Sequence, residues 1–464
     1  MITARDMAVG TAPLPQSPLI PAQAGIQSYA GSGNVKAWVP AFAGTSGQYV
    51  PPVVATPAAA LPLRERILLV VLFITVAASS VAFIEPSPHD GLMGVLALAC
   101  VIAGVRFERT LALLVLLLVV WNVSGLMSLL RVVQYEKTIQ YAATSVYLGV
   151  AAILFACLFA NNTMPRLTTM RIAYVVTAAA GALCGIAGYF HVFPGSDVFA
   201  PSGRALGAFK DPNVYGPFLI WPALFLLQRI LARRIGFVDL VTLGIILFGL
   251  LLSFSRGAWF HFTVSALVTI VLTFLTAPST RGRMRVLTLT VLAVAALAAL
   301  IVFLLSFSSI GRMFQERAQL IQSYDVGQGG RFRLQEIAVG SVLDFPDGMG
   351  PFEFARVNGL QQHNVYLQAF LVYGWAGAMA YFTLLLSTVF VGLRTVFTRT
   401  PWQPYIITAL ATFIGEIAEG FVIDTDHWRH FFLLLGMVWG LAAATFKQGR
   451  QVQMQKPAGF AVGL

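Results

Sequence analysis

Apolar residues form long runs that short polar segments separate over most of the chain. Runs of about 20 apolar residues recur, and each is long enough to cross a bilayer as a helix. The short alternating segments typical of membrane barrels are absent from the sequence. The pattern predicts an all-α, polytopic transmembrane protein of about twelve spans. We expect the spans at 65–84, 90–105, 110–130, 138–160, 169–190, 213–232, 236–254, 256–276, 286–307, 364–390, 404–423 and 430–446.

Composition and charge agree with a membrane protein. The chain is 58% hydrophobic and 11% charged, whereas soluble domains carry about 25% charged residues. We interpret the net charge of +11 as loop charge that fixes orientation, and we expect the lipid bilayer as a partner and no nucleic acid. The cysteines all lie in apolar runs and predict neither a disulfide nor a metal framework; they are Cys100, Cys157 and Cys184.

Lys and Arg are more frequent in the short loops on one side of the predicted membrane, as in the Arg281–Arg285 segment. The positive-inside rule then predicts that both termini are cytoplasmic. We expect a disordered N-terminal tail or an overextended start at 1–62, a membrane domain at 63–447 and a cytoplasmic tail at 448–464.

The outer face carries a segment at 191–212 and a long loop at 308–363, between spans nine and ten. Aromatic and aliphatic residues in this loop predict a folded, partly helical cap, with a helix near Arg331–Val342.

Three polar clusters lie at the outer starts of inward-running helices: Arg204–Asn213, Ser253–Gly257 and Gln361–Asn364. In the first, Asp211 suits an N-cap and Pro212 the first helical position. Helix N-termini with arginines nearby favour a phosphate or diphosphate site.

Each feature alone also has a structural explanation. Asp211 and Asn213 fit a simple cap, Arg256 fits a side chain that reaches the interface, and Arg331 and Arg333 fit solvated loop charges. The coincidence of these groups on one face favours the anion site.

Two further segments are candidates for a role. Glu416 and Glu419 share a helix face inside a span, where they would pair with Arg256 or Arg331 or contact an acceptor. The segment Asp424–His430 fits an interfacial turn anchored by Trp428 better than a metal site, and it would also suit the entrance for an acceptor.

Three motifs in order carry a family resemblance. They are Gly207–Asn213, Ser255–Gly257, and a third set made of Gly330-Arg331, Gly348–Phe352, His363–Leu367 and Tyr373–Gly377. With them the chain resembles the O-antigen ligase family, which includes O-antigen polymerase-like and protein O-oligosaccharyltransferase-like members. The resemblance covers about 65–446. It departs from the family at Phe332-Arg333-Leu334, where an Ile-Trp pair is usual, so the local packing of the cap is in doubt.

The resemblance implies a metal-independent, cofactor-free glycosyltransferase of the bacterial inner membrane with a periplasmic active site. The donor would be a glycan on undecaprenyl diphosphate, and the acceptor lipid A–core or a growing glycan. His363 would be the catalytic base, which a mostly neutral imidazole suits at pH 7. The groups implied to bind the diphosphate are Arg256 and Arg331, with Arg204 and Lys210 as weaker candidates. The supporting residues are Asp211, Asn213, Asn364, Glu416 and Glu419.

Three functions remain open at this point. O-antigen ligation to lipid A–core is favoured over polymerisation by a member of the same superfamily. A polysaccharide transporter or flippase is the third alternative. Transporters often show internal repeats and interrupted helices at the membrane midplane, whereas the polar clusters here lie toward one face.

Overall fold

The computed structural model describes residues 61–133, 135–232, 236–307, 311–315, 326–327 and 330–454. Within these ranges the regular structure is helical, as predicted. The expected N-terminal tail lies outside the described residues up to residue 60, and the expected C-terminal tail does so from 455 to 464, while 448–454 belong to the last helix. The longer helices are α1 (Leu63–Ala77), α2 (Pro88–Ala103), α3 (Ala112–Ser128), α4 (Tyr135–Ala160), α5 (Thr163–Tyr189), α6 (Pro212–Phe218), α7 (Ile220–Ala232), α8 (Phe237–Leu252), α9 (Arg256–Thr276), α10 (Thr280–Leu305), α12 (Arg331–Asp344), α13 (Glu353–Asn358), α14 (Val365–Val396), α15 (Gln403–Glu419) and α16 (Arg429–Met454).

Every run predicted to span the membrane overlaps at least one of these helices, although several helices extend beyond the predicted bounds. Among the described residues, eight helices are long and apolar enough to cross a bilayer, and α2 and α8 are shorter apolar helices. The multi-pass helical class is therefore supported, while the count of twelve spans stays a prediction. α10 exposes apolar side chains along most of its length, including Leu292, Val294 and Phe303. This exposure is expected of a helix that faces lipid.

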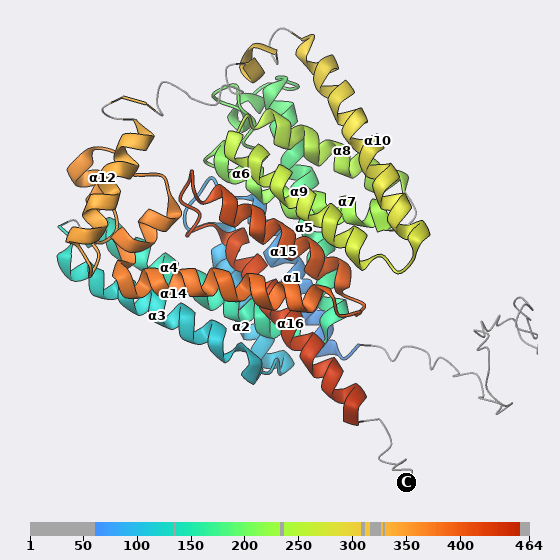
Figure 1. The fold of residues 1–464 in the computed structure, drawn as a ribbon, viewed down its shortest axis with the longest axis horizontal. Coiled ribbons are helices and arrows are strands. Elements are labelled where there is room, and N and C mark those ends of the chain that lie inside the picture. Colours follow the sequence, from blue (N-terminus) through green and yellow to red (C-terminus); the bar gives the residue numbers. More distant parts are fainter. Residues whose placement is uncertain are drawn as a thin grey trace, which may run out of the picture. The chain divides into compact units, whose positions relative to one another are not determined.

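The helices pack in pairs that are far apart in the sequence. α16 lies along α4, α14 along α3, and α15 along α9 (Figure 1). Glycines explain the close approach of α16 to α4. A Cβ at Gly436 would lie 2.6 Å from Cβ of Phe155, and one at Gly440 would lie 2.6 Å from the carbonyl oxygen of Ala156. Small residues four apart form a flat helix face, which lets a second backbone approach.

α14 is interrupted at Gly374, whose φ of 65° and ψ of −177° are not helical. The loop before α13 fills the break: Met349 N–H donates to the carbonyl oxygen of Leu371 at 2.6 Å, and Trp375 N–H donates to that of Pro346 at 2.8 Å. A Cβ at Gly374 would lie 2.6 Å from the carbonyl carbon of Asp347. Glycine is therefore required at this position. The two motifs Gly348–Phe352 and Tyr373–Gly377 meet here and join the cap to α14.

The predicted cap is present where the loop is described. α12 packs on α14 through a small apolar cluster of Leu334, Ala338, Val342, Phe354 and Leu371. This helix confirms the one expected near 331–342. The apolar loop residues do not all pack inward, however. Phe332 and Val339 are more than half exposed, and residues 316–325, with Arg317, lie outside the described residues.

A buried ion pair joins the start of α5 to the start of α1. Arg166 contacts Glu65 in a bidentate manner, with Nε–Oε1 and Nη2–Oε2 distances of 2.8 and 2.9 Å. Arg166 Nη1 also donates to the carbonyl oxygens of Leu158 and Asn161. Both charges therefore have partners in an apolar setting, which is the condition for burying them.

Candidate functional site

The first two polar clusters meet at the side chain of Asn213. Asp211 Oδ1 accepts a hydrogen bond from Asn213 N–H at 2.8 Å and caps α6, with Pro212 at the first position, as predicted. Asn213 Oδ1 accepts from Arg204 Nη2 at 3.1 Å and from Ser255 Oγ at 2.9 Å. Arg204 Nε also donates to the carbonyl oxygen of Ser253. The start of α6 is thus tied to the start of α9.

α9 begins with Arg256, after its N-cap Ser255, which accepts from Ala258 N–H. The next residue, Gly257, lies against the carboxylate of Glu419 on α15. A Cβ at Gly257 would be 2.6 Å from Glu419 Oε1. The start of α9 therefore touches the end of α15 where any larger side chain would collide.

Glu416 and Glu419 are fully buried, and both pair with histidines. Glu419 Oε2 lies 2.8 Å from His261 Nδ1, and Glu416 Oε1 lies 3.3 Å from His430 Nε2. His261 Nε2 also lies 3.0 Å from the carbonyl oxygen of Thr412. The sequence predicts that Glu416 and Glu419 are paired, but it does not predict these histidine partners. The available signal for His261 was its position one helical turn after Gly257.

The third cluster is attached to the same end of α15. Asn364 caps α14, since its Oδ1 accepts from the N–H groups of Tyr366 and Leu367 at 3.0 and 3.2 Å. Its Nδ2 donates to the carbonyl oxygen of Phe421, and Val365 N–H donates to that of Gly420. The starts of α6, α9 and α14 are therefore linked around the end of α15, so the three clusters lie close together.

His363 precedes this cap in a left-handed backbone conformation, with φ of 48°. Non-glycine residues rarely adopt it, and such strain often accompanies functional sites. The side chain is 45% exposed, and its Nδ1 lies 3.5 Å from Asp424 Oδ2. Burial raises the pKa of the Asp424 carboxyl, and the contact with His363 opposes that rise. No local pattern in the sequence joins Asp424 to His363.

Arg331 is the first residue of α12 and lies one turn before Gln335, on the same helix face. Gln335 Nε2 lies 3.5 Å from the carbonyl oxygen of His363. The face of α12 that bears Arg331 is therefore the one next to His363. Arg333 points elsewhere, since it pairs with exposed Glu336, as expected of a solvated loop charge.

The segment Asp424–His430 is a folded part of the site. Asp426 Oδ2 accepts from the hydroxyls of Tyr141 and Tyr373 at 2.6 and 3.2 Å and lies 3.2 Å from His427 Nδ1. Burial acts to raise the pKa of Asp426, but the facing His427 and the two hydroxyls outweigh burial and hold that pKa low.

Trp428 and Arg429 are held by packing and pairing within the protein. Trp428 is 7% exposed, so other parts of the protein cover most of its ring, and the interfacial position of this turn stays a prediction. Arg429 pairs with Asp90 through two contacts of 2.8 and 2.7 Å. Across the part of the chain that the structure describes, no group of three or more His, Cys, Asp or Glu side chains is arranged to hold a metal ion.

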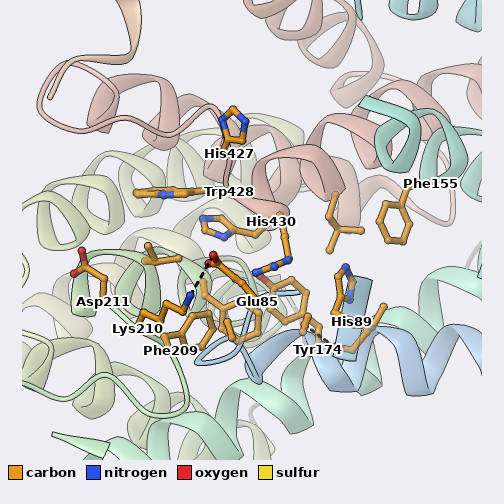
Figure 2. Close-up of a pocket in the computed structure, with 17 residues that line it drawn as sticks. Glu85, His89, Phe155, Tyr174, Phe209, Lys210, Asp211, His427, Trp428 and His430 are labelled. Atoms are coloured by element: carbon orange, nitrogen blue, oxygen red, sulfur yellow. Dashed lines mark hydrogen bonds and ion pairs between the residues drawn. The ribbon is translucent and has the colours of Figure 1, made fainter. Parts of the chain in front are cut away.

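A cavity of about 170 Å³ lies where the first cluster meets this segment (Figure 2). Lys210 and Glu85 line it and form an ion pair of 3.1 Å in which both side chains are about half exposed. Lys210 thus has a carboxylate partner, which neutralises the charge that a diphosphate would use. Its assignment to the diphosphate stays a prediction.

Comparison with known proteins identifies the same region. Residues 241–382 match the protein-family model described as O-Antigen ligase. The matched part includes the start of α9, the cap helix α12 and the start of α14 with His363. A search of curated proteins gives no match. The family match supports membership of the O-antigen ligase superfamily, as the motifs predicted.

Proposed function

We propose that this member of the O-antigen ligase superfamily transfers a glycan from undecaprenyl diphosphate to an acceptor hydroxyl at the periplasmic face of the bacterial inner membrane. The favoured reaction is O-antigen ligation to lipid A–core. The family match and the apolar helices support a membrane glycosyltransferase of this type. The observation that carries the mechanism is the half-exposed His363, paired with Asp424 and adjoining α12 and the start of α14.

His363 is the proposed general base. When Nδ1–H faces the Asp424 carboxylate, the lone pair of the neutral ring is on Nε2. The acceptor hydroxyl gives its proton to Nε2, and its oxygen attacks the anomeric carbon of the donor. The bond from that carbon to the diphosphate oxygen breaks, and the lipid diphosphate leaves with the electron pair. Asp424 stabilises the positive charge that develops on the ring.

Arg256 and Arg331 are the proposed groups for the leaving diphosphate, with Arg204 and Lys210 as weaker candidates. Arg256 and Arg331 are the first residues of α9 and α12, and helix N-termini attract anions. A guanidinium can contact two phosphate oxygens at once and stays charged, so it stabilises a leaving diphosphate directly. Asn213, which accepts from Arg204, fixes the orientation of that side chain.

The decisive test uses purified protein in liposomes with lipid-linked glycan and lipid A–core. We expect His363→Ala to lower the transfer rate by about 100-fold or more, the usual contribution of a positioned base. His191→Ala is the matched control, because His191 is also an exposed histidine with positive φ, 50°. Equal rates for the two variants would refute the assignment of the base.

Polymerase and transporter functions remain alternatives, and each predicts a distinct result. In a deletion strain, polymer that stays on the lipid anchor but is missing from the lipid core indicates a ligase. Loss of polymer from the anchor indicates a polymerase. Turnover of lipid-linked glycan by the purified protein without any gradient would exclude a transporter. Reporter fusions at both ends of the chain test the proposed cytoplasmic termini.

A further inference from the structure

The cavity of about 170 Å³ has the size of one small ring. A cavity of about 150 Å³ accommodates benzene. The walls come from several separate parts of the fold: the end of α1, the start of α2, Phe155 of α4, α5, the approach to α6 with α6 itself, and the start of α16. Figure 2 shows the side chains of His89, Tyr174, Phe209 and His430 gathered around it, with the Lys210–Glu85 pair between them.

The lining combines aromatic surfaces with hydrogen-bonding groups. Tyr174, Phe209 and Trp428 contribute rings, and His89 and His430 contribute imidazoles. His89 uses Nδ1 to contact the carbonyl oxygen of Thr75 at 2.9 Å, so Nε2 is the nitrogen that a ligand could engage. A sugar has the matching surface, because its C–H groups form apolar faces and its hydroxyls surround the ring.

His430 is the strongest sign of a missing ligand. Its side chain is 4% exposed, yet Nε2 makes no hydrogen bond to the residues that the structure describes. Nε2 lies 3.3 Å from Glu416 Oε1 without hydrogen-bond geometry, and both oxygens of Glu416 likewise lack a hydrogen bond in the described part of the chain. Buried polar groups nearly always find a partner. A hydroxyl in the cavity could both donate and accept, so it suits a histidine in either tautomer.

The charges around the cavity favour a neutral ligand. Two cations line it, Lys210 and Arg429, and two carboxylates, Glu85 and Asp211. The carboxylate partner of Arg429 is Asp90, and that of Lys210 is Glu85. A phosphate site would need an excess of unneutralised donors. An acyl chain would leave the histidine nitrogens that face the cavity without hydrogen-bond partners.

We infer that this cavity binds one sugar ring of a glycan substrate, as a subsite separate from the diphosphate-binding arginines. The inference rests on the proposed glycosyltransferase function and deepens it. Asp424–His430 connects the two places directly, since Asp424 contacts His363 and His430 lines the cavity. The ring could belong to the donor glycan or to the acceptor, and the two sources give different kinetic results.

The test fills the cavity without touching the proposed base or arginines. Ala82→Leu places a larger side chain in the cavity wall, and Ser79→Leu does so from an adjacent position. Among the described residues, Ser79 Oγ bonds only to the carbonyl oxygen of Val76 in its own segment, so this second variant keeps the test valid if the first fails to fold. Ala180→Leu is the control, because Ala180 is an exposed alanine on α5.

Binding is measured by saturation-transfer NMR on the full-length protein in nanodiscs, with methyl glycosides of glucose, galactose, rhamnose and N-acetylglucosamine as probes. We expect at least one probe to bind the wild type, Ala180→Leu and His363→Ala. The same probe should bind about tenfold or more weakly to both filled variants, equivalent to about 1.4 kcal/mol. Unchanged binding by the filled variants, or no binding of any probe to the wild type, would overturn the inference.

Transfer kinetics then separate the two sources of the sugar. A raised apparent KM for the lipid-linked donor alone, with the acceptor KM unchanged, places a donor sugar in the cavity. The reverse pattern places an acceptor sugar there, and unchanged values for both substrates refute a substrate subsite. A wild-type protein that binds the probe in the cavity but transfers no glycan contradicts the proposed function while leaving the sugar site intact.

Discussion

Replacing Asp424 with Asn removes the negative charge that faces the proposed base while keeping the size of the side chain. The Nδ1–Oδ2 distance to His363 is 3.5 Å. At that distance Coulomb's law gives about 1.2 kcal/mol for a dielectric constant of about 80, and about 4.7 kcal/mol for one of about 20. His363 is 45% exposed, so water screens the pair and the lower half of this range applies.

We therefore expect Asp424→Asn to slow transfer by about 10- to 100-fold, which corresponds to about 1.4–2.7 kcal/mol of transition-state stabilisation. The rate is measured with saturating lipid-linked glycan in liposomes. Asp347→Asn is the matched control, because Asp347 forms an exposed ion pair with Arg131 on another loop. That variant should stay within about twofold of the wild type. Equal rates for the two variants would refute the role given to Asp424.

The same substitution should have the opposite effect on stability. Burial raises the pKa of Asp424 in the folded protein, so the unfolded chain loses this proton at a lower pH. Stability therefore falls as pH rises from the unfolded pKa to the raised folded pKa, and the penalty persists at neutral pH. Asn cannot ionise and avoids this penalty. We expect Asp424→Asn to unfold at a higher temperature than the wild type at pH 7, with the difference vanishing toward low pH. A lower unfolding temperature at pH 7 would contradict this account.

Three further substitutions test the packing around the site. Gly257→Ala adds a Cβ 2.6 Å from a buried glutamate oxygen and should lower the free energy of unfolding by about 1–3 kcal/mol, measured by thermal unfolding. Gly244→Ala is the control, because Gly244 has open space around it, and it should leave stability unchanged. Equal stability of the two variants would refute the collision. Arg166→Ala leaves the carboxylate of Glu65 buried and unpaired and should cost about 3–5 kcal/mol of stability. A double substitution by Leu at both positions should recover much of that loss. Without recovery, lost packing and not the unpaired charge would explain the destabilisation. Asn364→Ala removes the cap of α14 and should cost about 1 kcal/mol. Asn364→Ser loses the same contact with the Phe421 carbonyl oxygen but can still cap the helix, so it should retain more stability than Asn364→Ala. Equal losses in chemical denaturation would count against capping.

Several features of the site followed from local sequence alone. The Asp211 cap with Pro212 after it, the helix start at Asn364 and the cap helix near Arg331 are all present as predicted. Each depends on residues that are neighbours in the chain, so turn and capping chemistry suffices to place it. The motifs also led to the superfamily that the match to residues 241–382 supports.

The pairings between helices did not follow in the same way. A membrane helix is apolar on its lipid-facing side and on its core side, so its sequence does not show which neighbour it meets. Glu416 and Glu419 were expected to pair with arginines, but they pair with His430 and His261 because α15 packs against both α9 and α16. The sequence likewise does not show whether Trp428 faces the lipid or the protein, and the structure shows that packing buries it.

The sequence by itself therefore determined that the protein is helical and apolar enough for a membrane, and which helix starts carry polar groups. Those properties are set by runs of neighbouring residues. Only the tertiary structure decided that Asp424 faces His363, that the end of α15 joins three helix starts, and that a ring-sized cavity lies beside His430. These contacts join segments far apart in the chain, and their formation depends on the packing of whole helices.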